Sequence, residues 1–156
     1  MPKKNRKIMD SVFKDSFGED RDCKKNFISL YNALSGNDYR LEDIKLIRKS
    51  IPQSVISTYD NDVSWEIDDK IVVLIEHQST INNNMPFRCL EYVTRIYETI
   101  VKSDARYKEK QIMLPTPAFY VGYGGDKNAP QKKVLKLSDS FYSPDNPKLE
   151  LTVRAG

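Results

Sequence analysis

The fold is decided by the stretch NDVSWEIDDKIVVLIEHQST, residues 61–80. Apolar and polar residues alternate over 63–67, a pattern typical of a half-buried strand. Asp68-Asp69-Lys70 follows as a turn, and the five apolar residues 71–75 predict a second strand, buried on both faces. Together the two strands predict a hairpin, and the rest of the chain is best understood around it.

The length of the turn sets which side chains face each other across this hairpin. A two-residue loop at Asp68-Asp69 would pair Asp62 with Ile75, whereas a three-residue loop that includes Lys70 would pair Asp62 with Glu76. Only the three-residue loop gathers the apolar side chains of both strands on one unbroken surface. Because register follows the buried face, we predict the three-residue loop.

Polar side chains gather at one end of the predicted hairpin. Glu76 and Gln78 share one face of their strand, with Asp62 beside them, while His77 points to the other face as a packed strand residue. Two carboxylates and an amide oxygen form a site of the kind that Mg²⁺ or Mn²⁺ prefers. Spacing alone favours a polar cluster at the edge of a sheet over a metal site.

The flanking sequence alternates between helical and strand patterns. Apolar spacings of three and four predict helices over 8–17, with Gly18 as the stop, and over 22–34. Residues 41–50 suit either a short helix or a strand edge. Further strands are predicted at 54–59, 119–121 and 149–153. A helix that starts near Pro86 is predicted to bury Phe87, Leu90, Val93 or Thr94, Tyr97 and Ile100-Val101.

Composition describes an ordinary globular chain of 156 residues with a net charge of +3. That charge permits a nucleic-acid partner without implying one. No apolar run approaches the roughly 20 residues of a membrane span, so we expect no membrane segment. Two distant cysteines suit a reducing cytoplasm, and a single histidine argues against zinc.

The order of elements predicts an α/β fold, a mixed central sheet flanked by helices. We expect one domain over 1–156, with an N-terminal helical part (1–50), a core of hairpin, helix and strand (51–125) and a C-terminal extension (126–156). The sequence stops just past a predicted strand, which is typical of a truncated or short form.

Several motifs carry a family resemblance that runs from about residue 8 to the end. They are Asp10-Ser11-Val12-Phe13-Lys14, Asn61-Asp62-Val63-Ser64, residues 75–82 (IEHQSTIN), Asn84-Met85-Pro86-Phe87-Arg88 with Tyr92, residues 114–117 (LPTP) and residues 135–139 (LKLSD). The chain resembles the recombination-promoting nuclease and transposase family of the PD-(D/E)XK nuclease superfamily. The resemblance implies a restriction-endonuclease-like three-layer core and magnesium-dependent cleavage of DNA, with DNA as the partner and a homodimer as one admissible assembly.

The resemblance also assigns roles to residues of the hairpin. Asp62 corresponds to the motif aspartate and Glu76 to the second acidic ligand of Mg²⁺ or Mn²⁺. Gln78 stands where many members of the superfamily have lysine. A glutamine is neutral, so it can only orient water or support the metal.

Four further residues are candidates for supporting roles. Arg88 and Tyr92 lie four apart on one helical face, where they could hold a phosphate or brace Glu76. Asp10 and Lys14 lie one helical turn apart and are most simply an ion pair, with bracing of the active site as the alternative.

Two motifs depart from the family pattern. Pro117-Ala118-Phe119 stands where Pro-Glu-Phe is expected, and Tyr123-Gly124-Gly125 stands where Tyr-Asn-Gly is expected. The first change could remove an auxiliary carboxylate, and the second suggests a changed turn.

The resemblance as a whole predicts a metal-dependent DNA endonuclease of mobile-element type. The alternative is a decayed or shortened relative that binds DNA or protein without cutting.

Overall fold

The computed structural model describes residues 11–50, 63–78, 80–124 and 132–156. Within these ranges six strands form one sheet: β1 (Leu46–Lys49), β2 (Val63–Ile67), β3 (Ile71–Gln78), β4 (Thr116–Tyr123), β5 (Lys133–Lys136) and β6 (Thr152–Ala155). The helices are α2 (Cys23–Ser35) and α3 (Met85–Ile100). Short helical turns are η1 (Asp15–Glu19), η2 (Leu41–Asp43), η3 (Ala105–Tyr107) and η4 (Leu137–Ser140).

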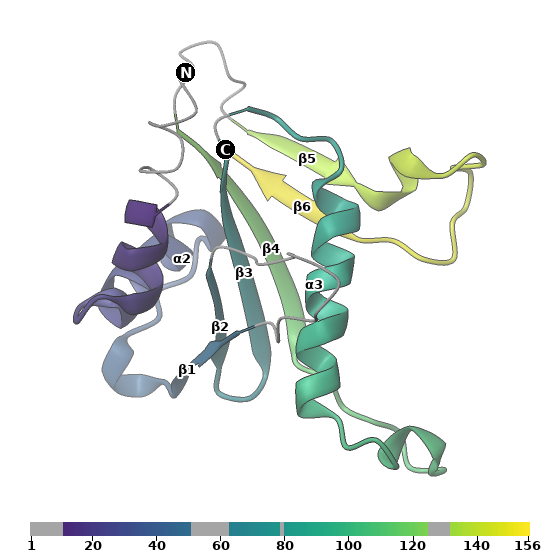
Figure 1. The fold of residues 1–156 in the computed structure, drawn as a ribbon, viewed down its shortest axis with the longest axis horizontal. Helices are drawn as coiled ribbons and strands as arrows, with labels where there is room; N and C mark the ends of the chain where they lie inside the picture. The colour runs from purple at the N-terminus through teal and green to yellow at the C-terminus, as the bar shows by residue number, and fades with distance from the viewer. Residues whose placement is uncertain (1–10, 51–62, 79, 125–131) are drawn as a thin grey trace.

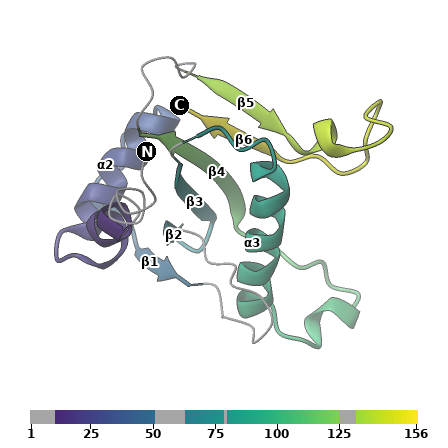
Figure 2. The ribbon, with the colours of Figure 1, turned by 45° about the horizontal axis from the view of Figure 1, so that its top comes forward.

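The sheet is mixed, with strand order β1-β2-β3-β4-β6-β5. β1, β2 and β3 are antiparallel neighbours, β4 runs parallel to both β3 and β6, and β5 returns antiparallel to β6. The helix α2 lies on one face of the sheet and α3 on the other (Figure 1), and the turned view in Figure 2 separates the same layers. This three-layer arrangement confirms the predicted α/β, restriction-endonuclease-like fold class.

The central hairpin has the predicted register. Val63 pairs with Ile75 and Ile67 pairs with Ile71, so the loop consists of the three residues 68–70. The apolar side chains of both strands therefore face α2 together, as the buried-face rule requires.

The turn residues adopt a backbone conformation that few residue types tolerate. Asp68 and Asp69 have φ angles of 52° and 57°, in the left-handed region where aspartate is enriched. The Asp68 carboxylate accepts a hydrogen bond from the Lys45 backbone N–H at 2.7 Å, which ties the turn to the residue just before β1. Both aspartates are turn formers at the end of the hairpin away from Glu76, as expected.

The strand β2 differs from its prediction, because all five of its residues are buried and not only the apolar ones. Ser64 and Glu66 are 0% and 4% exposed. The neighbouring β1 supplies their partners: the Lys49 ammonium lies 3.3 Å from Glu66, and the Ser64 hydroxyl donates to the Lys49 carbonyl. Alternation alone could not reveal that β1 would satisfy these polar groups.

Apolar packing fills both sides of the sheet. On the α2 side the buried core is Phe27, Ile28, Tyr31, Leu46, Val63, Trp65, Ile67, Val73, Ile75 and Tyr120. On the α3 side it is Val72, Leu74, Met85, Cys89, Tyr92, Val93, Ile96, Phe119, Val121, Leu135, Leu137, Leu151, Val153 and Ala155. Strands from both the first 50 residues and the last 31 therefore share one sheet with the hairpin.

The buried stripe of α3 is rotated from the predicted one. Phe87, predicted to be inside, is 52% exposed, and the inward positions include Cys89, Tyr92 and Ile96. Leu90, Tyr97 and Ile100 pack only partly against the core. The rotation brings Tyr92 against the sheet, next to the end of β3.

Several observed boundaries differ from the predicted ones, and the segment 41–50, for which both a helix and a strand were open, contains one of each. Helical structure at 11–14 continues as η1 through Gly18 to Glu19, and residues 41–50 form both η2 and β1. The last strand begins at Thr152 because the preceding Glu150 carboxylate accepts backbone hydrogen bonds from Ser138 and Leu151. The strand predicted at 54–59 lies outside the described residues.

No helix in the described ranges is both long and apolar enough to cross a membrane.

Candidate active site

The candidate site lies where β3 and β4 end and α3 begins. Glu76 and Gln78 both point to the α3 face of β3, and they are 3% and 8% exposed. The parallel strand β4 ends beside them, with Tyr123 in register with Gln78. The carboxyl ends of parallel strands are a common place for sites in α/β sheets.

Arg88 forms an ion pair with Glu76. Its Nη2 atom lies 3.2 Å from Glu76 Oε2, and the Arg88 side chain is 29% exposed against 4% for Glu76. Burial alone lowers the pKa of Arg88, but the Glu76 carboxylate and the Tyr92 hydroxyl raise it, and the net direction is upward. The guanidinium therefore stays charged at any ordinary pH.

Tyr92 holds the same guanidinium from one helical turn away. Its hydroxyl oxygen accepts hydrogen bonds from Arg88 Nη2 at 2.6 Å and from Arg88 Nε at 3.1 Å. Burial, and then the negative charge of Glu76, raise the pKa of Tyr92 to about 12. The predicted pair on one helical face is thus in contact, and Arg88 bridges Tyr92 to Glu76.

Met85 joins the site, although no role was predicted for it within the motif at 84–88. Its sulfur accepts weak hydrogen bonds from Gln78 Nε2 at 3.3 Å and from Arg88 Nη1 at 3.4 Å. Met85 is fully buried at the start of α3. The contact directs the amide nitrogen of Gln78 toward the helix and leaves its carboxamide oxygen as the atom that could meet a cation or a water.

The remaining predicted residues lie elsewhere or outside the described ranges. Asp62 and Asp10 are not among the described residues. Lys14 is half-buried on the N-terminal helical segment, which packs on the α2 side, where the Phe13 ring stacks on His77 at a centroid distance of 5.4 Å. His77 is therefore a packed residue of the opposite face, as expected.

The chain has Ala118 where the family pattern has glutamate, but this difference does not remove a ligand from the site around Glu76. Ala118 pairs with Val73 and packs in the α2-side core, whereas Glu76 pairs with Val121 on the α3 side. Neighbouring strands in register present paired residues on the same face. A side chain at position 118 would thus point away from Glu76.

The donor set suits a hard divalent cation. The carboxylate of Glu76 and the carboxamide oxygen of Gln78 are oxygen ligands of the type that Mg²⁺ and Mn²⁺ take. Among the described residues no three His, Cys, Asp or Glu side chains come together. The second predicted ligand, Asp62, is outside those residues, so the described part of the site holds one carboxylate.

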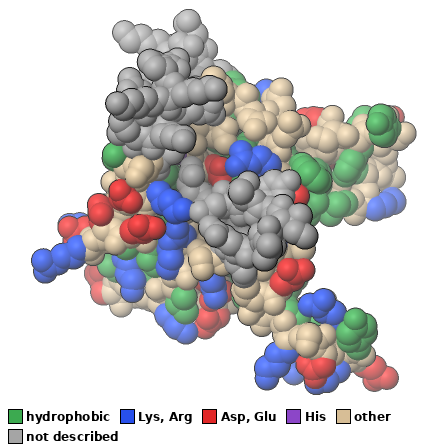
Figure 3. All heavy atoms as spheres, in the orientation of Figure 1, with side chains coloured by type: hydrophobic (Ala, Val, Ile, Leu, Met, Phe, Trp, Pro, Cys, Tyr) green, Lys and Arg blue, Asp and Glu red, His purple; other side chains and the backbone are tan. Residues whose placement is uncertain are grey.

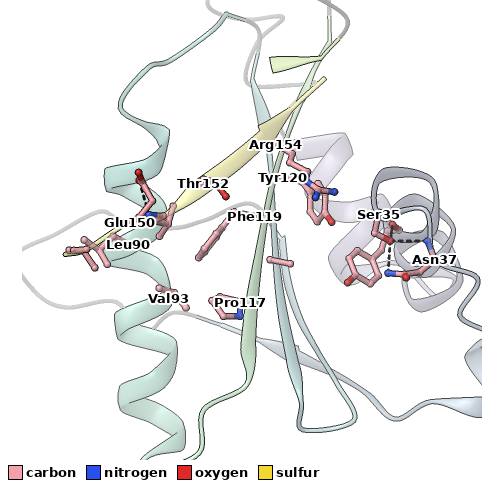
Figure 4. Close-up of a pocket in the computed structure, with 14 residues that line it drawn as sticks. Ser35, Asn37, Leu90, Val93, Pro117, Phe119, Tyr120, Glu150, Thr152 and Arg154 are labelled. Carbon is pink, nitrogen blue, oxygen red and sulfur yellow. Dashed lines mark hydrogen bonds between the residues drawn. The ribbon is translucent and has the colours of Figure 1, made fainter. Parts of the chain in front are cut away.

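A separate cleft of about 540 Å³ lies beside β4. Phe119 and Tyr120 point to opposite sides of the strand there, toward α3 and α2 respectively (Figure 4). Neither Glu76 nor Arg88 lines it.

On the face shown in Figure 3, Lys and Arg side chains of the described residues are interspersed with Asp and Glu, which agrees with the small net charge.

The mixed sheet between helices, with a buried acidic residue near the end of its central hairpin, is consistent with the restriction-endonuclease-like class of proteins. The chain belongs to the PD-(D/E)XK nuclease family of transposases, whose family model matches residues 7–120. It is also 31% identical over 110 residues to the inactive recombination-promoting nuclease-like protein RpnE of Escherichia coli (strain K12). That match covers 67% of this chain and 33% of RpnE, so the chain spans about one third of its relative. No solved structure matches the chain.

Proposed function

We propose that this chain is a metal-dependent DNA endonuclease of mobile-element type, which hydrolyses phosphodiester bonds. One observation carries the proposal: a buried carboxylate, Glu76, ends the central hairpin in the register that predicts Asp62 opposite to it. Membership of a nuclease family supports the same class of reaction.

The proposed cofactor is Mg²⁺ or Mn²⁺, with Asp62 and Glu76 as its ligands. When bound, such an ion lowers the pKa of a coordinated water and neutralises charge on the phosphoryl group. Glu76 offers hard oxygens from a strand that is paired on both sides, which fixes the direction of its side chain. Its burial also strengthens electrostatic interactions relative to those in bulk water.

The side chains around Glu76 have separate proposed roles in orienting water and in binding phosphate. Gln78 orients a water or a phosphate oxygen by hydrogen bonding, but it cannot supply the positive charge of the lysine found in many relatives. Arg88 forms an ion pair with Glu76 and has the planar donor fork that suits phosphate. Tyr92 and Met85 hold that fork at the site.

The proposal is tested by nicking of supercoiled plasmid DNA in Mg²⁺. The wild type is expected to nick, while Asp62→Ala and the isosteric Glu76→Gln abolish nicking. Asp69→Asn is the matched control, because it removes an exposed carboxylate from the other end of the hairpin. Equal activity of the wild type and Asp62→Ala contradicts the assignment.

A second candidate is a relative that binds DNA or a partner protein without cutting. The neutral Gln78 favours this candidate, and RpnE carries the word inactive in its own name. Titration with Mn²⁺ separates the two functions, since a pure binding module has no saturable metal site that depends on Glu76.

A further inference from the structure

The ion pair between Arg88 and Glu76 joins two groups with unequal access to water. The Glu76 carboxylate is nearly inaccessible, while the Arg88 side chain keeps more than a quarter of its surface exposed. A buried carboxylate requires a compensating charge, because an uncompensated one is costly in a low-dielectric environment. Arg88 supplies such a charge from the solvent side.

Arg88 is also held by two acceptors that carry no charge. The Tyr92 hydroxyl accepts from Nη2 and Nε, and the Met85 sulfur accepts from Nη1. These contacts do not depend on Glu76. If the ion pair opens, the guanidinium keeps Tyr92, Met85 and water as partners, so its displacement leaves no buried donor group unsatisfied.

A divalent ion on Glu76 conflicts with this ion pair. An ion such as Mg²⁺ would take a carboxylate oxygen at about 2.0–2.1 Å, on the same carboxylate whose Oε2 atom lies 3.2 Å from Arg88 Nη2. A divalent and a monovalent cation only a few ångströms apart repel each other strongly. We therefore expect the ion pair between Arg88 and Glu76 to weaken the binding of a divalent ion to Glu76, and the bound ion to weaken the ion pair.

We propose that Arg88 is a displaceable counter-cation of Glu76, which competes with the divalent metal and moves off the carboxylate when the metal binds. The inference rests on the proposed function, since it needs Glu76 to be a metal ligand. It makes Arg88 a positioning residue that lowers metal affinity, with its exposed side chain then directed to the side on which a phosphate would approach.

The test is calorimetric titration of the whole chain with Mn²⁺ in three variants. Arg88→Gln removes the competing charge and is expected to bind Mn²⁺ about 5- to 100-fold more tightly than the wild type, the usual size of a coupling between two binding events. Arg88→Lys keeps the charge and stays close to the wild type. Arg106→Gln, an exposed change of the same kind beyond the far end of α3, has no effect.

Each outcome of the titration decides between the proposals. If Arg88→Gln binds Mn²⁺ more tightly than the wild type, the result supports competition between Arg88 and the metal for Glu76. The same holds if Arg88→Gln binds Mn²⁺ and the wild type binds none. Equal or weaker binding by Arg88→Gln, with a Glu76-dependent site in the wild type, overturns the competition and leaves the proposed function standing. No saturable binding by either folded protein overturns both.

A measurement on the wild type alone guards against a variant that fails to fold. The Arg88 Nη2–H resonance, assigned by nuclear magnetic resonance, is expected to shift as Mg²⁺ saturates the protein, because Nη2 loses its carboxylate partner. An unchanged resonance at saturation, or the lack of any saturable effect of Mg²⁺ on the spectrum, overturns the displacement.

Discussion

Gly124 lies so close to the His77 side chain that any added Cβ atom would force that side chain to shift. A Cβ atom built on it would lie 2.4 Å from Nε2 of His77, well inside van der Waals contact. The Gly124 N–H donates to the Gln78 carbonyl at 3.2 Å, which keeps the backbone near β3, and the His77 ring stacks on Phe13. Substitution of Gly124 by alanine must therefore move the imidazole ring.

The cost follows from what the ring loses when it moves. Overpacking a filled site costs about 1–3 kcal/mol, and a stacked ring pair contributes about 0.5–1.5 kcal/mol. We expect Gly124→Ala to lower the free energy of unfolding by about 1–3 kcal/mol. Urea denaturation measures this change for Gly124→Ala, His77→Ala and the double variant.

The two substitutions are expected to be strongly coupled. Without the imidazole ring the new methyl group has room, so Gly124→Ala should cost no more than about 0.5 kcal/mol in the His77→Ala background. Gly122→Ala, two residues earlier near the end of β4, is the control, because its Cβ would meet nothing closer than the Glu76 carbonyl at 4.0 Å. A Gly124→Ala cost that is negligible, or equal in both backgrounds, would refute the steric explanation.

Two further predictions concern ionisable groups on the α3 face. Because the pKa of Tyr92 is raised to about 12 in the folded state, its contribution to stability is complete below pH ~10 and is lost as the pH rises from ~10 to ~12. Urea denaturation should show the wild type losing roughly 1–2 kcal/mol more than Tyr92→Phe over that window, and identical pH profiles would contradict it. Lys49→Met leaves the buried Glu66 carboxylate without its ammonium partner and should lower the free energy of unfolding by about 2–4 kcal/mol. Adding Glu66→Gln should recover part of that loss, and no recovery would show that the ion pair is not the cause.

The hairpin could be predicted from the sequence because its information is local. Apolar alternation, an Asp-rich turn and a five-residue apolar run lie within 61–80 and admit only two registers. One of these breaks the apolar face, so the choice was decided without knowledge of any other segment. The observed pairing of Val63 with Ile75 confirms that choice.

The rotation of α3 was not predicted, because the sequence carries two overlapping apolar stripes and the contact with β3 selects the one at 85, 89, 92, 93 and 96. A hydrophobic pattern counts Phe87 as inward and Arg88 as outward. In the structure the buried Glu76 carboxylate has Arg88 and Tyr92 on its side of the helix, and Phe87 is exposed. Met85 lies in the motif at 84–88, but its contacts with Gln78 and Arg88 form only when α3 meets the end of β3.

The significance of Ala118 likewise required the long-range register. The sequence shows that a glutamate is missing relative to the expected motif, but not the face on which it would have lain. The parallel pairing of β3 with β4 joins segments about 45 residues apart and decides that position 118 faces α2. The loss therefore argues less strongly for decay of the site than the sequence alone suggested.

Strand direction explains why the candidate site forms at this edge of the sheet. The antiparallel β2 begins where β3 ends, the parallel β4 ends there too, and α3 starts seven residues after Gln78. A carboxylate placed at this junction is buried by all of them, and in its charged form it is costly without a compensating charge. Arg88 pairs with this carboxylate. If Glu76 holds a metal as proposed, the occupancy of the metal and the position of Arg88 are expected to be linked, and a change in one then appears in the other.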